Sequence, residues 1–555
     1  MLRWIAVLAL LIAAPVASFA KPAAAEFDWF EYSGHDGLPK PGSGEYANPI
    51  LQGFYPDPSI LRVGRDYYLV NSTFAWFPGM PIFHSRDLVH WTQIGNAIDR
   101  SRQLDFAKTN MGLGLYAPDI SFHDGVFYLV NTCVGCGGTF VITAKNPAGP
   151  WSDPVFLPDL DGAIDPSIFF DTDGKAWIVN NGPPPEKPRY EGHRAIWLQQ
   201  VDFRRMKTVG PREVLVDGGV HPEQNPIWIE APHIFRKDGF YYLIDAEGGT
   251  SEQHSEVVFR SQKVTGPYVP LSTNPILTQR DLPNDRPRPI TSTGHAQFVE
   301  TPKGEWWAVF LGVRPYDRAN NFNTGRETFM LPVRWKDGWP RITDPGQLVP
   351  WVVKAPDLPR QAKGPVPLNG DFSLREEFNS PKLPLYWMML RNPERHWWRI
   401  ANGTLQLDPR PVALGDDGNP SLLARRQQHQ NATATTKLQF HPADDRAEAG
   451  LVAMQSDEFY YFIGIGSDRG KPVVRVRKRA GANQSTLAEA SLPGRGPVQL
   501  RISAHGPSYD FAWSRDGRHW RTLVKGADGT ILSTKKAGGF VGAVFALYAH
   551  DGGNR

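Results

Sequence analysis

The fold of this chain is most constrained by a strand–turn–strand pattern that recurs five times within residues 55–312. In each copy a first strand leads through a short turn, several of them with Asp-Gly, into a second strand rich in aromatic and β-branched residues. The copies begin at Tyr55, Tyr116, Ile164, Ile229 and Gly294. Equivalent positions in successive copies are 49 to 65 residues apart, which suits a four-stranded blade. The pattern therefore predicts an all-β fold with a five-bladed β-propeller.

Aligning the copies on the aromatic residue of the second strand brings one position into register. Its occupants are Asp57, Tyr116, Asp165, Glu230 and His295. Because the first strand of every blade lines the central channel, we expect these side chains to converge at one mouth of that channel. Asp before Pro is also a common turn residue, which is the structural alternative for each Asp taken singly. Three acids in one register on separate blades favour a functional site instead.

Several longer stretches resemble a known family and occur in that family's order. They are NPILQGFYPDPSI, YAPDI, AIDPSI, IEAPHIF, AEGGT, TGHAQF and GRETFMLPVRW. Through them the chain resembles glycoside hydrolase family 43, in its branch of β-xylosidases and α-L-arabinofuranosidases. The resemblance covers residues 47–345 and implies a propeller catalytic domain that hydrolyses glycosides with inversion.

The resemblance also implies roles for individual residues. Asp57 corresponds to the general base, Glu230 to the general acid, and Asp165 to the acid that orients the general acid and adjusts its pKa. Substrate-binding positions correspond to Phe74, Trp76, Tyr116, Thr250, His295 and Arg326. Arg326 is expected to hold the hydroxyls of the terminal sugar. Two positions depart from many relatives, which have Trp at Tyr116 and Gly at Ala231, and the first of these departures affects the expected sugar.

This chemistry needs a protonated acid at the leaving oxygen and an ionised base that holds water on the opposite face, with the carboxyls roughly 6.5–9.5 Å apart. Carboxylates on different inner strands, across a channel, can meet that spacing. The pKa of Glu230 should be raised toward roughly 6–7, and an ionised Asp165 would raise it by repulsion. We expect Asp57 to stay ionised, helped by backbone N–H groups or by Arg326.

No metal or other cofactor is required for this reaction. His295 can line the cavity, contact a structural ion in the channel, or be a buried structural histidine. The stretch DTDG at 171–174 lacks the further ligands of a calcium loop and falls where every copy turns. A structural Ca²⁺ in the second domain stays open. Cys133 and Cys136, the two cysteines of the chain, predict a small loop disulfide, with a free thiol pair as the alternative.

The N-terminus reads as a secretory signal peptide over residues 1–20, with cleavage as late as about residue 25. A signal anchor is the alternative, but the apolar run is short for a span. The expectation is therefore an exported protein, periplasmic or extracellular, with no membrane contact after signal removal. A net charge of +3, with basic residues scattered along the chain, gives no nucleic-acid surface. The oligomeric state is left open.

A second domain follows a proline-rich linker at residues 346–371. Residues 372–555 alternate like strands around Asp-Gly turns, which predicts a β-sandwich of the concanavalin-like, jelly-roll type that accompanies the same family. It can bind carbohydrate or only support the propeller. Four tryptophans favour binding, but paired aromatics on strands usually include a core-facing member, so support is preferred. They are Trp397, Trp398, Trp513 and Trp520.

The leading functional hypothesis is an exo-acting β-xylosidase that releases xylose from xylo-oligosaccharides during hemicellulose breakdown. The alternative is an α-L-arabinofuranosidase, or a dual activity, on arabinoxylan, since both sugars present similar hydroxyls to one pocket. An endo-acting arabinanase is disfavoured because the resemblance is to the exo-acting branch. A catalytically silent carbohydrate-binding propeller is the remote alternative, and the presence of all three acids argues against it.

Overall fold

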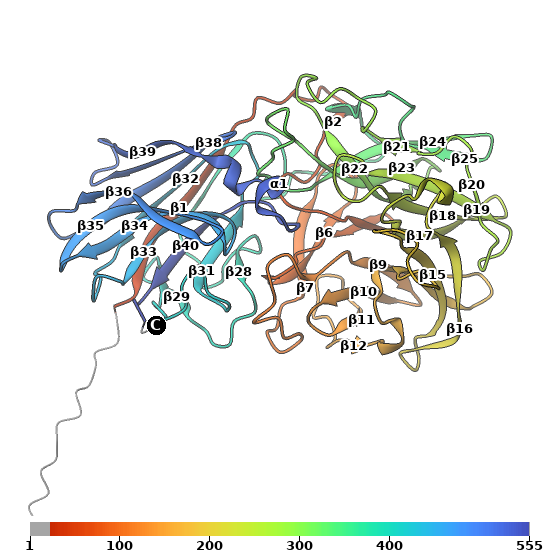
Figure 1. Cartoon of the computed structure of the whole chain (residues 1–555), viewed down its shortest axis with the longest axis horizontal. Helices are drawn as coiled ribbons and strands as arrows, with labels where there is room; N and C mark the ends of the chain where they lie inside the picture. The colour runs from red at the N-terminus through yellow and green to blue at the C-terminus, as the bar shows by residue number, and fades with distance from the viewer. Residues whose placement is uncertain (1–22, 554–555) are drawn as a thin grey trace, which may run out of the picture.

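The computed structural model describes residues 23–553 as two β-rich domains that lie side by side (Figure 1). One is a five-bladed propeller and the other a two-sheet sandwich, so the predicted fold class is confirmed. Among the described residues the helical elements are short: η1 (Pro158–Leu160), η2 (Pro222–Gln224), η3 (Gly529–Leu532) and α1 (Thr534–Ala537).

The five blades follow one another along the chain. Blade I holds β3 (Ser59–Val63), β4 (Asp66–Val70), β6 (Gly79–Ser85) and β7 (Thr92–Ile98). Blade II holds β8 (Gly114–Leu115), β9 (Asp119–His123), β10 (Val126–Val134), β11 (Gly138–Ala144) and β12 (Val155–Phe156). Blade III holds β13 (Ile164–Phe170), β14 (Ala176–Gly182), β15 (Ala195–Asp202) and β16 (Lys207–Asp217). Blade IV holds β17 (Glu230–Lys237), β18 (Phe240–Glu247), β19 (Ser255–Ser261), β20 (Val269–Pro270) and β21 (Leu277–Thr278). Blade V holds β22 (Thr291–Glu300), β23 (Trp306–Val313), β24 (Glu327–Lys336) and β25 (Trp339–Arg341).

The sandwich consists of two eight-stranded sheets. The first contains β1 (Ala25–Gly34), β27 (Phe372–Glu376), β29 (Trp398–Ala401), β30 (Thr404–Leu407), β32 (Asn431–Gln439), β37 (Val498–His505), β38 (Ser508–Ser514) and β39 (Arg521–Asp528). The second contains β5 (Trp76–Phe77), β28 (Met388–Leu390), β31 (Ser421–Arg426), β33 (Glu448–Ser456), β34 (Phe459–Asp468), β35 (Lys471–Ala480), β36 (Asn483–Ser491) and β40 (Val544–His550).

Two of the Asp-Gly turns predicted from the sequence adopt the backbone conformation of a tight hairpin turn. At Asp124-Gly125 and Asp238-Gly239 both residues have positive φ, from 49° to 83°. A two-residue hairpin turn of this hand needs positive φ at both positions, and it matches the twist of the strands it joins. In blades II and IV these turns therefore fix how the innermost strand pairs with the second strand near the turn, while a register shift between Glu230 and His233 sets the orientation of the first residues of β17.

A single buried carboxylate, that of Asp119 on β9, links the inner strands around the channel. It accepts hydrogen bonds from Ser59 Oγ of blade I (3.2 Å), the Ile168 backbone N–H of blade III (3.0 Å) and Gln297 Nε2 of blade V (3.0 Å). The His233 ring of blade IV lies 3.6 Å away. Asp119 is thus the hub through which the blades hold one another in position.

The chain ends of the propeller are tied to the sandwich more closely than the sequence analysis expected. Strand β1, which was assigned to neither domain, pairs with β32, β27 and β30 of the sandwich and appears in Figure 1 as the red strand among the blue ones. The predicted linker 346–371 is not a bare tether either. It contains β26 (Val352–Lys354), which pairs with β2 (Glu45–Ala47) just before blade I.

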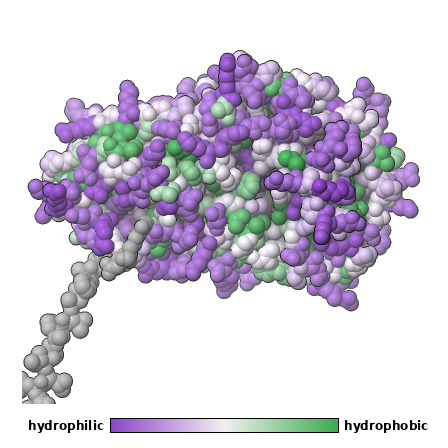
Figure 2. Space-filling model, in the orientation of Figure 1, coloured by the Kyte–Doolittle hydropathy of each residue, from purple (hydrophilic) through white to green (hydrophobic). Residues whose placement is uncertain are grey.

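The sandwich tryptophans mostly serve packing. Trp397 and Trp513 are buried, at 1% and 3% exposure, and the ring of Trp520 lies under the guanidinium of Arg501 at 3.6 Å. This agrees with the preferred supporting role of the domain. On the face shown in Figure 2, hydrophobic residues form scattered patches among hydrophilic ones. In the part of the chain described here, no helix is both long and apolar enough to cross a bilayer. The predicted signal peptide lies outside the described residues.

Candidate active site

The five register residues meet in one cavity of about 280 Å³ at the mouth of the channel. Its lining includes Asp57, Tyr116, Asp165, Glu230 and His295, so the convergence predicted from the repeat is confirmed. It also includes Phe74, Thr250 and Arg326, which the family resemblance had named. Each register residue lies at or near the start of the innermost strand of a different blade.

Asp57 is buried and firmly held. Arg326 donates from Nη1 to its Oδ1 (2.8 Å) and lies 3.4 Å from its Oδ2 through Nη2, and the Ser72 hydroxyl donates to the same carboxylate. The backbone of Asp57 has φ of 51°, an uncommon conformation for a residue with a side chain. Such outliers concentrate at functional sites, where the surrounding structure maintains them. The guanidinium of Arg326 thus fixes the orientation of the Asp57 carboxylate, as a general base requires.

Glu230 and Asp165 face a different environment. Burial raises the pKa of Glu230 well above its usual value, and the charges of Asp165 and Asp57 raise it further. Burial, followed by the charge of Asp57, raises the pKa of Asp165 to about 7. The raised pKa favours the protonated form of Glu230, which is the state that a general acid requires. Asp165 is positioned by Asn181 Nδ2 (3.3 Å) and by the backbone N–H of Ala231 (3.2 Å).

Two buried histidines lie near the catalytic carboxyls, and His295 is the one that lines the cavity. His295 Nδ1 lies 3.8 Å from Asp57 Oδ1, and burial lowers the pKa of His295 to about 3, so its ring is neutral. His254, which the sequence analysis did not single out, has Nδ1 3.1 Å from the Ser292 carbonyl and Nε2 3.8 Å from Glu230 Oε1. Burial lowers the pKa of His254 to about 4. His254 therefore places a neutral ring, with Nε2 unpaired among the described residues, beside Glu230.

One wall of the cavity is aromatic and draws on both domains. Phe74 stacks on Phe540 with ring centroids 5.7 Å apart, and Tyr116 contacts both rings edge-on. Phe540 comes from the loop that follows α1 in the sandwich and lines the cavity, a role that the sequence analysis missed. Its flanking glycines, Gly-Gly before and Val-Gly after, signal a loop, but no local pattern shows that this loop reaches the propeller.

The two departures from the family pattern have structural consequences. The hydroxyl of Tyr116 donates to the Gly112 carbonyl (3.1 Å), so Tyr116 presents its ring rather than its hydroxyl to the cavity wall. Ala231 has φ of 54°, a conformation in which glycine is at ease and alanine is strained. In this conformation the backbone N–H of Ala231 donates to the Asp165 carboxylate and orients it.

The structure corrects one expected substrate contact. Trp76 was expected to bind sugar, but it is fully buried and does not line the cavity. Its strand β5 pairs with β28 of the sandwich, and its ring packs in the apolar cluster between the domains, beside Phe54. The positive φ of Phe74, 52°, turns the chain so that Phe74 faces the cavity while Trp76 faces the sandwich.

Thr250 and Arg326 share the polar side of the cavity. Arg326 Nη1 donates to Thr250 Oγ1 (3.1 Å), while Arg326 Nε is buried and has no partner among the described residues. An unpaired buried donor is costly unless a ligand accepts from it. Arg326 is therefore placed to bond a hydroxyl of a bound sugar, as the resemblance implied.

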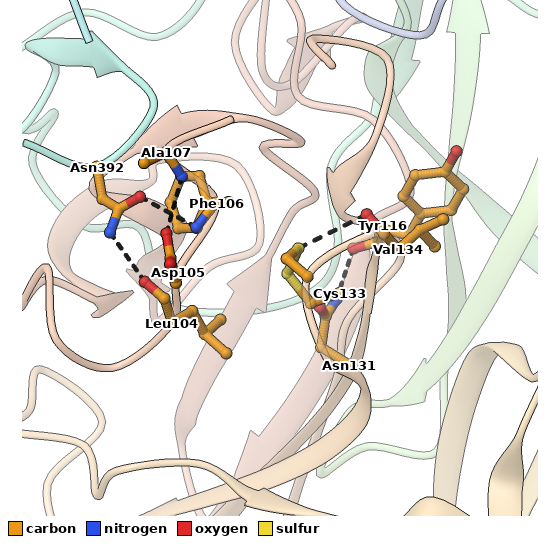
Figure 3. Close-up of a disulfide and its surroundings, with 10 residues drawn as sticks. Leu104, Asp105, Phe106, Ala107, Tyr116, Asn131, Cys133, Val134 and Asn392 are labelled. Atoms are coloured by element: carbon orange, nitrogen blue, oxygen red, sulfur yellow. Dashed lines mark hydrogen bonds between the residues drawn. A yellow bond between two sulfur atoms is a disulfide. The ribbon is translucent and has the colours of Figure 1, made fainter. Parts of the chain in front are cut away.

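The predicted disulfide joins Cys133, near the end of β10, to Cys136 in the turn that follows, close to Tyr116 (Figure 3). Asn131 Nδ2 in the same strand donates to the Tyr116 carbonyl (2.6 Å), which connects this loop to the cavity wall. Within residues 23–553 no group of three or more His, Cys, Asp or Glu side chains is arranged to hold a metal ion.

Comparison with known proteins agrees with this geometry. Residues 46–340 match the family model for glycosyl hydrolases family 43, and residues 375–555 match that of the β-xylosidase C-terminal concanavalin A-like domain. A xylosidase/arabinosidase of Butyrivibrio fibrisolvens is 37% identical over 518 residues, covering 91% of this chain and 96% of that protein. The non-reducing end α-L-arabinofuranosidase BoGH43B of Bacteroides ovatus is 36% identical, covering 92% of each. A solved structure from a capybara gut metagenome, described as GH43_12, superposes with a TM-score of 0.88 at 39% identity and covers 96% of this chain and all of that one. The chain belongs to glycoside hydrolase family 43.

Proposed function

We propose that this enzyme removes one terminal pentose at a time from xylose-containing oligosaccharides, with inversion, and acts foremost as a β-xylosidase. The observation that carries the proposal is the pairing, in one cavity, of a carboxyl whose pKa is raised with a carboxylate held by arginine. Glu230 is the first and Asp57 the second. Asp57 takes a proton from water as that water attacks the anomeric carbon, and Glu230 gives its proton to the departing oxygen.

The size of the cavity and the burial of the residues around its base support cleavage at a chain end. Its volume of about 280 Å³ lies near the lower limit of ligand pockets, which usually span about 300–1,000 Å³, and suits one small sugar. Around the base, Asp57, Phe74 and Arg326 are between 1% and 6% exposed. Little surface is left there for a continuing chain, which favours the entry of a terminal sugar.

The second candidate is an α-L-arabinofuranosidase, or an enzyme with both activities. It is favoured by the relatives, since one is named for both sugars and another for arabinofuranose alone. The aromatic wall with Tyr116, where many relatives have Trp, also leaves the choice of pentose open. We propose as well that the protein is exported, because its first twenty residues have the composition of a signal peptide.

The deciding experiment compares an aryl β-xyloside with an aryl α-L-arabinofuranoside, using the purified chain and its Asp57→Ala variant. A higher kcat/KM on the xyloside supports the leading proposal, and preference for the arabinofuranoside replaces the sugar while keeping the mechanism. Proton NMR of the first product should show the inverted anomer. Activity equal to that of Asp57→Ala on both substrates would refute the proposed hydrolysis. Sequencing the mature N-terminus from the periplasm and the medium tests export.

A further inference from the structure

Beside the catalytic cavity lies a larger cleft of about 710 Å³, here called the side cleft. The two share three lining residues: Tyr116, Ile164 and Trp228. The other walls of the side cleft are the disulfide loop (residues 133–139), residues 157–163 and Arg194. Figure 3 shows the disulfide loop beside Tyr116, which lines both spaces.

The shared residues place the side cleft on the acid side of the cavity. Ile164 immediately precedes Asp165, and Trp228 lies two residues before Glu230. Residues around the base, such as Asp57 and Arg326, line the cavity but not the side cleft. The general acid protonates the oxygen of the departing group, so that group must lie on the side of Glu230.

Trp228 has the properties of a sugar platform at this junction. It is 39% exposed, which is unusual for so large an apolar side chain, and its φ is 53°. Its position is nevertheless fixed, since its N–H donates to the Gly192 carbonyl (2.8 Å) and the Arg194 guanidinium lies 5.2 Å from its ring centroid. Exposed, strained and held aromatic residues are typical of binding sites, where a flat apolar face meets a ligand.

Arg194 is held in turn by the catalytic wall. It donates from Nε to Asn181 Oδ1 (2.8 Å) and from Nη2 to the Gly162 carbonyl (3.2 Å), and Asn181 also bonds Asp165. Trp228 therefore stacks on a guanidinium that is connected to the carboxylate network. The platform is thus connected, through Asn181, to Asp165 beside the general acid.

We propose that the side cleft binds the leaving part of the substrate, with the first sugar beyond the cleaved bond stacked on Trp228 and a further sugar along the disulfide loop. This inference rests on the proposed glycosidase function and names where the rest of the chain lies. The side cleft has more than twice the volume of the cavity, which leaves room for two rings. The preferred substrates are then oligosaccharides of three or more sugars rather than disaccharides.

The test separates the side cleft from the cavity. We would measure kcat/KM on xylobiose and xylotriose, and the inhibition constant of xylose, for the wild type, Trp228→Ala, Trp228→Phe and Ile227→Ala. Ile227 is the matched control, because it is adjacent, 43% exposed and lines neither space. Trp228→Ala should lose about tenfold in kcat/KM on xylotriose, since a stacked ring and its buried area are removed. Inhibition by xylose should stay within twofold, Trp228→Phe should restore most of the loss, and Ile227→Ala should match the wild type.

Binding measured without turnover keeps the result independent of the proposed activity. In a Glu230→Gln background, which lacks the proton donor, calorimetry should show xylotriose binding more tightly than xylose and losing that advantage with Trp228→Ala. Equal losses for xylose and xylotriose would make Trp228 a wall of the terminal-sugar cavity and overturn the inference. Unchanged kinetics and binding would also overturn it. Failure of the wild type on both aryl glycosides would instead refute the proposed function, and the calorimetry would still decide where an oligosaccharide lies.

Discussion

Replacing Asp119 by alanine should destabilise the propeller more than any single change at the cavity, because this carboxylate links the inner strands. Four donors face it: Ser59 Oγ, Ser121 Oγ, the Ile168 N–H and Gln297 Nε2. Two of these donors, the serine hydroxyls, keep another hydrogen-bond partner when Asp119 is removed. Ser121 Oγ also lies 3.3 Å from the Ile168 carbonyl, and Ser59 Oγ still accepts from the Ile120 N–H. The Ile168 N–H and the Gln297 amide are left without an acceptor.

A hydrogen bond to a charged group contributes about 1.5–3 kcal/mol, so two lost bonds predict a fall of about 3–6 kcal/mol in the free energy of unfolding. In a domain of this size that corresponds to a Tm lower by about 10 °C. Asp119→Asn keeps the shape of the side chain but turns an amide N–H₂ toward donors. The free energy of unfolding of this variant should therefore lie between those of Asp119→Ala and the wild type. Ser121→Ala removes one bond of a half-buried hydroxyl and should cost about 1 kcal/mol or less.

The assay is differential scanning fluorimetry at one fixed scan rate, together with the denaturant midpoint, because a chain of two domains can unfold irreversibly on heating. Tyrosine and tryptophan fluorescence and circular dichroism should show that each variant is folded before heating. If Asp119→Ala melts within 2 °C of Ser121→Ala, the linking role of this carboxylate is refuted. The apolar contacts and the other hydrogen bonds between blades, such as that from Ser167 Oγ to the Pro232 carbonyl, would then hold the propeller.

Three further predictions concern the cavity. Glu230→Ala should lower kcat on xylobiose by about 100- to 10,000-fold, because general acid catalysis contributes that much, but should spare an aryl glycoside with a good leaving group. Equal losses on both substrates would contradict the acid role. Asp165→Asn removes a charge that raises the pKa of Glu230. Because activity is lost as pH rises through that pKa, the alkaline limb of the pH profile of kcat/KM should move to lower pH, and an unmoved limb would contradict the effect of Asp165 on Glu230. Phe540→Ala should lower kcat/KM for the terminal sugar by about tenfold with little change in Tm, and an unchanged kcat/KM would remove the sandwich from the site.

The convergence of the register residues could be predicted because it follows from period and topology. Strands that begin each blade share one wall of the channel, so Asp57, Asp165 and Glu230 had to meet once the repeats were aligned. Their assignment as base, modulator and acid came from the family resemblance, and their environments agree with it: arginine holds the first, while burial raises the pKa of the other two.

What the sequence did not reveal depends on contacts between distant segments. Phe540 and strand β1 look like ordinary strand and loop residues locally, and nothing within a window of sequence indicates that they cross to the other domain. The prediction that Trp76 contacts sugar was wrong for a related reason. Its neighbour Phe74 adopts a left-handed backbone conformation, so side chains two residues apart face different domains, which alternation along a strand does not predict.

The contacts between the two domains help to position catalytic residues and do not merely link the domains. Arg326, which holds the base, is followed directly by Glu327, whose carboxylate is paired with the buried Arg314 at 2.5 and 3.0 Å. Arg314 also binds Asp36, which follows β1, at 2.8 Å and the Gln428 carbonyl of the sandwich at 3.1 Å. Since β1 and the sandwich strands form one sheet, the propeller is inserted between two parts of the sandwich. The sandwich therefore supplies Phe540 on one side of the cavity and anchors the residue next to Arg326 on the other, so the position of the base depends on both domains being in place.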